Sequence, residues 1–127
     1  MKTIKKIYTI NSSVDKVWEA LVNPKIIEKW SGAKVEMSDQ KDFNFKFWDG
    51  DIFGKNLEVV KNKKLVQDWS ENGWENPSRV TFSLISNGGK TELTLIHENV
   101  PGKELKSIDD GWDEYYLSPL KNLLENS

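Results

Sequence analysis

The C-terminal stretch carries the clearest helical pattern of the chain. Between residues 107 and 125, apolar side chains recur every fourth position, a spacing that places them on one face of an α-helix. The stripe comprises Ile108, Trp112, Tyr116, Leu120 and Leu124, and is widened by Tyr115 and Leu123. Ser107 is a favourable N-cap, and Pro119, which has no amide hydrogen, predicts a kink or weakened turn just before Leu120. We therefore predict one long amphipathic helix that needs a large apolar partner surface.

The first thirty residues predict a strand followed by two short helices. Residues 4–10 alternate imperfectly between apolar and polar side chains, as in a short strand. Ser12 and Asp15 form a capping-box pattern before a helix of about ten residues with an apolar stripe. Pro24 can begin a second short helix, which carries Trp30.

From residue 33 onward the period of the apolar positions changes to two, which predicts β-strands. Short polar turns separate the segments with this pattern: residues 33–37, 43–47, 52–60, 64–69, 79–85 and 91–97. Asp49-Gly50 is the strongest hairpin signal, because both central residues of a type I′ turn have positive φ. Short turns join antiparallel strands, so we predict a meander of six strands in an antiparallel sheet.

One face of this sheet is predicted to be apolar and to receive the C-terminal helix. We expect that face to carry Phe43, Phe45, Phe47, Phe53, Phe82 and Leu84. Within single strands, the alternation predicts one common face for Phe53, Leu57 and Val59, and another for Leu93, Leu95 and His97. The expected fold class is α+β in the order β-α-α-β6-α, with a curved antiparallel sheet wrapped around the helix in a single domain of residues 1–127.

The charge, the cysteine and histidine content and the hydropathy of the chain exclude several classes of function. The net charge is −2 with acids and bases mixed along the chain, so there is no electrostatic footprint for nucleic acid. The absence of cysteine excludes disulfides and thiolate metal sites, and one histidine among scattered acids gives no metal-ligand spacing. No apolar run reaches the ~18 residues of a membrane span, and the N-terminus lacks the apolar segment of a signal peptide. We expect a cytoplasmic protein without metal, cofactor or recognisable catalytic residue.

Several motifs resemble those of a known family. Residues 17–21 (Val-Trp-Glu-Ala-Leu), 23–24 and 29–30 resemble the opening of START-like (SRPBCC, helix-grip) domains. Three later stretches are similar to heat-shock protein 90 ATPase activator homologues: residues 48–54 with 57–58, residues 64–69 and residues 89–97. Residues 100–101, 111–112, 116 and 119–121 extend the similarity to the end of the chain. The resemblance covers essentially the whole chain. It implies a seven-stranded curved sheet gripping the C-terminal helix, with a cavity between them that can hold an apolar ligand.

The resemblance is to the C-terminal-domain type of this family. The eukaryotic co-chaperone with this domain also carries a separate N-terminal domain that engages the chaperone, for which these residues show no counterpart. This fold hosts many functions, so the function must be argued from the site.

Candidate side chains for the cavity follow from the expected inward face and from the helix. They are Trp30, Phe45, Phe47, Phe53, Leu57, Gln67, Trp69, Phe82, Leu84, Leu95, His97, Trp112, Tyr115 and Tyr116. For Trp112 and His97 we favour structural roles, because burial of an indole is sufficient reason for a tryptophan and a strand-end histidine usually has hydrogen-bond partners. Gly111 suggests a close approach of the helix to a strand.

Three functions fit these patterns. The preferred one is a non-enzymatic domain that binds a small hydrophobic molecule between sheet and helix. The second is a chaperone-interacting module, in which Trp48 and Trp74 are candidate contact residues because tryptophan is enriched at interface hot spots. The third is an enzyme of cyclase or hydrolase type, with His97 as its one candidate for proton transfer at neutral pH.

Overall fold

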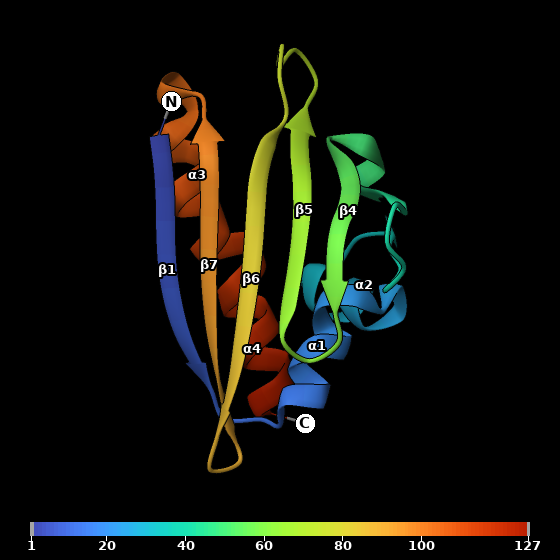
Figure 1. The fold of residues 1–127 in the computed structure, drawn as a ribbon, viewed down its shortest axis with the longest axis vertical. Coiled ribbons are helices and arrows are strands. Elements are labelled where there is room, and N and C mark those ends of the chain that lie inside the picture. The colour runs from blue at the N-terminus through green and yellow to red at the C-terminus, as the bar shows by residue number, and fades with distance from the viewer. Residues whose placement is uncertain (1, 127) are drawn as a thin grey trace.

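The structure, a computed structural model, describes residues 2–126. Its seven strands form one antiparallel sheet in the order β1-β7-β6-β5-β4-β3-β2, and the helices cover one face of it (Figure 1). In chain order the elements are β1 (Lys2–Ile10), α1 (Val14–Val22), α2 (Pro24–Ser31), β2 (Val35–Glu36), β3 (Asn44–Phe47), η1 (Trp48–Gly50), β4 (Ile52–Val60), β5 (Lys64–Glu71), β6 (Ser78–Asn87), β7 (Lys90–Val100), η2 (Gly102–Glu104), α3 (Leu105–Gly111), η3 (Trp112–Leu117) and α4 (Ser118–Glu125). This is the predicted helix-grip arrangement.

The two N-terminal helices form as expected, but with a different first cap. Ser13 is the N-cap of α1 and makes no side-chain capping bond, so the predicted Ser12–Asp15 capping box is wrong. Between the helices, the Asn23 side chain accepts a hydrogen bond from the Lys25 amide at 3.0 Å, which caps α2. Pro24 occupies the first turn of α2, where its missing amide hydrogen leaves no helical bond unmade.

Register places Phe53 on the outer face of the sheet, where it is 37% exposed. Phe47 pairs directly with Ile52, and directly paired residues share a face, so buried Phe47 turns Ile52 inward and Phe53 outward. A register shift between Asn56 and Glu58 then leaves Leu57 unpaired and reverses the alternation. Val59 therefore packs against the core, whereas Leu57 lies beside Asp68, Arg79 and Glu98 on the outer face. The prediction that Phe53, Leu57 and Val59 face one way is wrong.

The C-terminal helix is continuous from Leu105 to Glu125, but its middle, η3, is π-helical. The helix begins at Leu105 rather than at Ser107, and no side chain caps it. The π-helical stretch directly precedes Pro119, and the Ser118 amide bonds to the Asp113 carbonyl five residues back. The weakened turn predicted before Leu120 is therefore a π-helical stretch.

The π-helical turns change which side chains reach the core. In an α-helix, residue i+5 lies about 140° around the axis from residue i, but the wider π turn returns it to the same face. Leu117, five residues after Trp112, is accordingly fully buried. Tyr115 is 60% exposed instead of widening the buried stripe, which corrects the prediction.

Polar contacts fix the helix to edge strand β1. Lys6 forms ion pairs with Asp113 at 2.8 Å and Asp109 at 3.1 Å, and the Tyr8 hydroxyl donates to Asp113 at 2.5 Å. One turn from the end, Lys121 Nζ donates to the Thr9 carbonyl at 2.6 Å. The helix is thus held closely on the β1 side, and the space between it and the far strands β4 and β5 is where a groove remains.

Candidate ligand-binding groove

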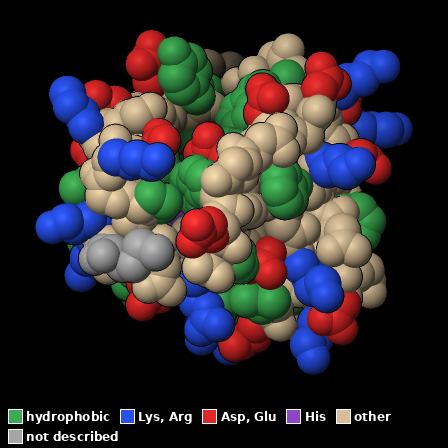
Figure 2. Space-filling model, turned by 90° about the horizontal axis from the view of Figure 1, so that it is seen from above, with side chains coloured by type: hydrophobic (Ala, Val, Ile, Leu, Met, Phe, Trp, Pro, Cys, Tyr) green, Lys and Arg blue, Asp and Glu red, His purple; other side chains and the backbone are tan. Residues whose placement is uncertain are grey.

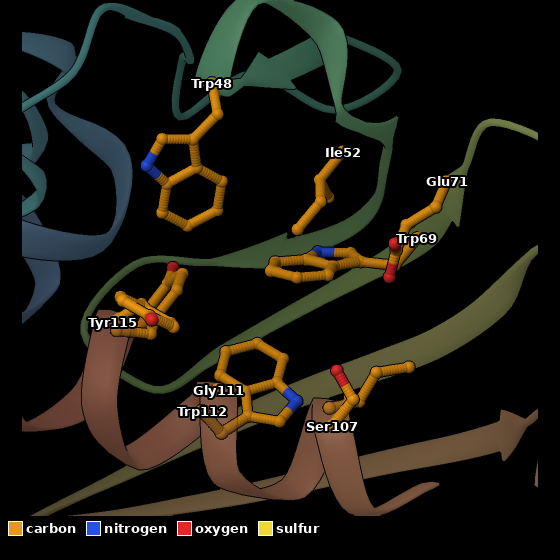
Figure 3. Close-up of a pocket in the computed structure, with 10 residues that line it drawn as sticks. Trp48, Ile52, Trp69, Glu71, Ser107, Gly111, Trp112 and Tyr115 are labelled. Carbon is orange, nitrogen blue, oxygen red and sulfur yellow. The ribbon is translucent and has the colours of Figure 1, made fainter. Parts of the chain in front are cut away.

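A groove of about 180 Å³ opens between the C-terminal helix and strands β4 and β5 (Figure 3). Its aromatic lining consists of Trp48, Trp69, Trp112, Tyr115 and Tyr116. The remaining lining residues are Ile52, Glu71, Ser107, Ile108 and Gly111. Other hollows, such as one of about 390 Å³ bounded by Glu28, Lys46 and Asp49, are lined mainly by polar and turn residues. The aromatic groove is therefore the candidate site, because ligand pockets are mostly apolar with a few polar groups.

The floor of the groove is a packed aromatic cluster. The ring centroids of Trp69 and Trp112 lie 4.7 Å apart, and those of Trp112 and Tyr116 lie 4.8 Å apart. These three side chains are buried, whereas Trp48 is half-buried and Tyr115 is exposed. The rigid floor is thus built from the sheet and the helix, and the rim from the β3–β4 turn and the helix surface.

The turn that carries Trp48 has an unusual backbone. Trp48, Asp49 and Gly50 all have positive φ, at 50°, 56° and 90°. Asp49 (φ 56°, ψ 29°) and Gly50 have the positive φ values of the central residues of a type I′ turn, and the Asp51 amide donates to the Trp48 carbonyl at 3.1 Å, so the hairpin predicted from Asp49-Gly50 is confirmed. Phe47 and Ile52 are the last paired residues, so the loop between the strands is residues 48–51. A positive φ is rare for a bulky side chain, and here it accompanies the placement of the indole at the groove.

Four of the predicted cavity residues line this groove: Trp69, Trp112, Tyr115 and Tyr116. Six others are buried and fill the space between sheet and helices: Trp30, Phe45, Phe47, Phe82, Leu84 and Leu95. The Trp30 ring packs 4.6 Å from Tyr116, and its indole N–H donates to the Ala20 carbonyl at 2.9 Å. Phe53 and Leu57 lie on the outer face, away from the groove. Most of the expected cavity is therefore occupied by core side chains.

His97 lies inward, as predicted, within a closed hydrogen-bond network. The Ser78 hydroxyl donates to the Trp69 carbonyl at 2.8 Å, so at its 2.7 Å contact with His97 Nε2 it serves as acceptor. The Trp112 indole N–H donates to His97 Nδ1 at 3.0 Å. The imidazole is thus neutral, with its proton on Nε2. Burial lowers the pKa of His97 from its ordinary 6.5 to about 4.

Gln67 belongs to a second buried network that orients the floor. Its side-chain amide donates to Asn56 Oδ1 at 2.9 Å, and its oxygen accepts from the Trp69 indole N–H at 2.9 Å. Asn56 in turn donates to the carbonyls of Ser38 and Gln40 at 2.8 and 2.9 Å. Gln67 therefore positions Trp69 from below without lining the groove.

Two polar groups at the groove stand apart from these networks. Tyr116 is 2% exposed, and its buried hydroxyl has no hydrogen-bond partner within residues 2–126, an exception to the usual pairing of buried polar atoms. Glu71, at the end of β5, is half-buried. Burial, together with the carboxylates of Glu104 and Asp51, raises the pKa of Glu71 above its ordinary value.

Sequence reasoning missed Trp48, Ile52, Glu71, Ser107, Ile108 and Gly111 as members of the site. Glu71 had a signal, because it continues the inward alternation of Leu65, Gln67 and Trp69. Gly111 was expected to contact a strand, which is wrong, since a Cβ placed there would meet only the Tyr115 ring at 3.9 Å. The glycine lies at the groove wall instead.

Among residues 2–126, no three histidine, aspartate or glutamate side chains are grouped so that they could hold a metal ion. None of the helices in that part of the chain combines the length and hydropathy needed to cross a bilayer.

Comparison with known proteins identifies the family. Residues 11–125 match the family described as Activator of Hsp90 ATPase homolog 1-like protein. An uncharacterized protein of Schizosaccharomyces pombe is 25% identical over 118 residues, and the mouse activator of 90 kDa heat shock protein ATPase homolog 2 is 24% identical over 117 residues. Each alignment covers 91% of this chain but 35% of the relative's length.

A crystal structure of an HSP90 activator from Plasmodium falciparum has the same fold. Its TM-score is 0.91 at 23% identity, and the match covers 98% of this chain and 96% of that one. Sequence and fold agree, and the chain belongs to the family of Activator of Hsp90 ATPase homolog 1-like proteins.

Proposed function

We propose that this chain is a non-enzymatic binding domain that takes a small, mainly apolar molecule in the groove between β4, β5 and the C-terminal helix. The observation that carries the proposal is the groove itself, which three tryptophans and Tyr116 line, and beside which the buried Tyr116 hydroxyl has no hydrogen-bond partner within residues 2–126. Small-molecule sites typically combine aromatic walls with a few polar groups that fix orientation.

The groove volume limits the ligand size. Pockets for drug-sized ligands begin at roughly 300 Å³, and this groove has about 180 Å³. It therefore suits a small molecule, or one compact group of a larger one, rather than a long lipid chain.

The state of His97 supports binding over catalysis. Both ring nitrogens are engaged by Ser78 and Trp112, and a pKa of about 4 keeps the ring neutral at physiological pH. General acid–base catalysis works best with a pKa near the operating pH.

The test is a screen of small apolar compounds by NMR, following the indole N–H signals of the tryptophans. We expect binders to shift the signals of Trp48, Trp69 and Trp112, and Trp48→Ala to weaken binding by roughly tenfold. Trp74→Ala is the matched control, because Trp74 lies in the β5–β6 loop and does not line the groove. Binding that responds equally to both substitutions, or no binder at all, would contradict the proposal.

A chaperone-interacting role is the second candidate, favoured by relatives named as activators of the 90 kDa heat-shock protein ATPase. The chain spans about a third of their length, so we propose contact with the chaperone rather than the whole activity. Neither Trp48 nor Trp74 is fully exposed, but Trp74 borders a surface hollow beside Pro101 and Glu104. Co-purification with the host's own chaperone and measurement of its ATPase turnover test this role. Unchanged turnover together with no complex would exclude it.

A further inference from the structure

We propose that the group recognised in the groove is a small organic cation, an alkyl- or methyl-substituted ammonium, held against the tryptophan faces with Glu71 as its counter-charge. This inference rests on the proposed binding function of the groove and names the chemical class of its ligand. Three independent features of the groove lead to it: its aromatic composition, the sign of its charge, and its size.

The walls are suited to a cation because aromatic faces carry negative electrostatic potential. Tryptophan attracts cations most strongly, and clusters of aromatic side chains are the usual receptors for quaternary ammonium groups. Trp48, Trp69 and Trp112 all line the groove. In Figure 3, Trp48 and Tyr115 lie toward one end, Glu71 and Ser107 toward the other, and Trp69 and Trp112 between them. A bound ammonium would thus have indole rings on one side and a carboxylate on the other.

The charges around the groove have one sign. Glu71 is the charged residue among the lining side chains, and the nearby carboxylates of Glu104 and Asp51 act on it. No lysine or arginine within residues 2–126 forms an ion pair with Glu71. Seen from the end of the molecule where β5 terminates, basic side chains project mainly at the margin, whereas hydrophobic and acidic ones occupy the middle (Figure 2). An anionic ligand would meet repulsion here.

Lysines on the helix and on β1 form ion pairs with carboxylates other than Glu71. Lys106 of α3 pairs with Asp110 at 3.0 Å, and Lys6 of β1 pairs with Asp113 and Asp109. A half-buried carboxylate without a cationic partner is costly, and a ligand cation would compensate it. The groove therefore combines a preformed aromatic seat with an unmatched negative charge.

The size of the groove agrees with a compact head group. A volume of about 180 Å³ is below the roughly 300 Å³ at which pockets for drug-sized ligands begin, so the groove suits a compact group such as trimethylammonium with a short substituent.

The test compares probes of equal shape and different charge. Choline, its neutral isostere 3,3-dimethyl-1-butanol and the anion 3,3-dimethylbutanoate are titrated into the full chain, with the tryptophan indole N–H signals as readout. We expect choline to bind at least about tenfold more tightly than the alcohol, and the anion to bind most weakly. Glu71→Gln should weaken choline binding by about tenfold and leave the alcohol unchanged. Glu92→Gln, the same charge change on the outer face of β7, should alter neither.

A pH titration of the unmodified chain gives a second measurement, independent of how the variants fold. Choline affinity should fall as the pH is lowered through the pKa of Glu71, which lies above the usual range of glutamate, while alcohol affinity stays constant. If the alcohol binds as tightly as choline, the cation inference is overturned and the proposed binding function stands. If neither these probes nor any compound of the screen shifts the indole signals, both are overturned.

Discussion

At the scale of single residues, the buried polar groups next to the aromatic floor differ in whether they have hydrogen-bond partners. His97 has one acceptor and one donor contact, with Ser78 and Trp112 at its two nitrogens. The Tyr116 hydroxyl, equally buried, has no partner in the described residues. The alternation with Leu93 and Leu95 predicted that His97 faces inward. It did not identify the partners, because Ser78 and Trp112 reach His97 through tertiary contact from another strand and from the helix.

We predict that His97 makes stability depend on pH between about 4 and 6.5. Its pKa is about 4 in the fold and about 6.5 when unfolded, so the unfolded chain binds more protons in that window. The His97 contribution is complete above pH 6.5 and decreases as the pH falls, by about 3 kcal/mol in total at pH 4. Urea unfolding at pH 7 and pH 4.5 measures it. His97→Gln retains one donor and one acceptor without titrating, and an unchanged pH dependence in this variant would contradict the assignment.

At the scale of elements, the C-terminal helix and strand β4 each depart from regular geometry. The π-helical η3 brings Leu117 into the core and leaves Tyr115 outside. The unpaired Leu57 in β4 separates an outward Phe53 from an inward Val59. Pro119 indicated the irregularity in the helix. A regular period, however, does not predict that Leu117 rather than Tyr115 faces the core, or that Val59 faces the core while Phe53 faces outward.

The register of the C-terminal helix predicts very different losses of stability when Leu117 or the nearby Tyr115 is truncated to alanine. Leu117→Ala should lower the free energy of unfolding by about 3 kcal/mol, because it leaves a cavity at a fully buried site. Tyr115→Ala should change it by no more than about 0.5 kcal/mol, because this side chain is mostly exposed. Guanidinium unfolding of both variants provides the comparison, and a larger loss for Tyr115 would indicate an unbroken α-helix.

The close pairing of β4 with β5 leaves no room for a side chain at Gly54. A Cβ on this residue would lie 1.9 Å from the backbone oxygen of Asp68, in the paired strand β5, and the backbone has no room to yield. Gly54→Ala should therefore cost about 3 kcal/mol or more of unfolding free energy. Gly102→Ala is the control, because nothing lies within 4 Å of its added Cβ. Equal stability of the two variants would show that β4 and β5 are farther apart than described.

At the scale of the whole molecule, one core joins the sheet to all the helices. It extends from Ile10 in β1 through Trp18 in α1 and Phe47 in β3 to Leu120 in α4. Lys6, Tyr8 and Lys121 fasten the helix along β1, while Trp112 and Tyr116 pack against Trp69 of β5. The groove lies above this aromatic contact, on the side of the helix toward β4 and β5.

A shared core predicts a single unfolding transition for residues 1–127. Tryptophan fluorescence, which reports the aromatic floor, and far-UV circular dichroism, which reports the backbone, should give coincident urea curves. The Trp48→Ala variant keeps the core tryptophans and serves as the control for the rim. Separate midpoints for the two signals would mean that sheet and helices unfold as distinct units.

The sequence by itself determined the kind and order of the elements. Periods of two and 3.6 follow from backbone geometry, so the alternation at Phe43, Phe45 and Phe47 and the stripe from Trp112 to Leu120 were sufficient. The short turns then required antiparallel pairing, and Glu71 could have been added to the site by extending the alternation of β5.

Only the tertiary structure decided which side chains meet. Strand pairing, not strand composition, determined that Phe53 faces outward. Pro119 indicated a weakened turn, but only the structure shows that this turn is π-helical and that Leu117 is buried. Trp48, Glu71 and Trp112 come from a turn, a strand end and a helix, and they share a groove because the packing of the helix on the sheet brings these three elements together. A period describes one element, whereas a site depends on the distances between elements, and those distances are set by the packing of the whole core.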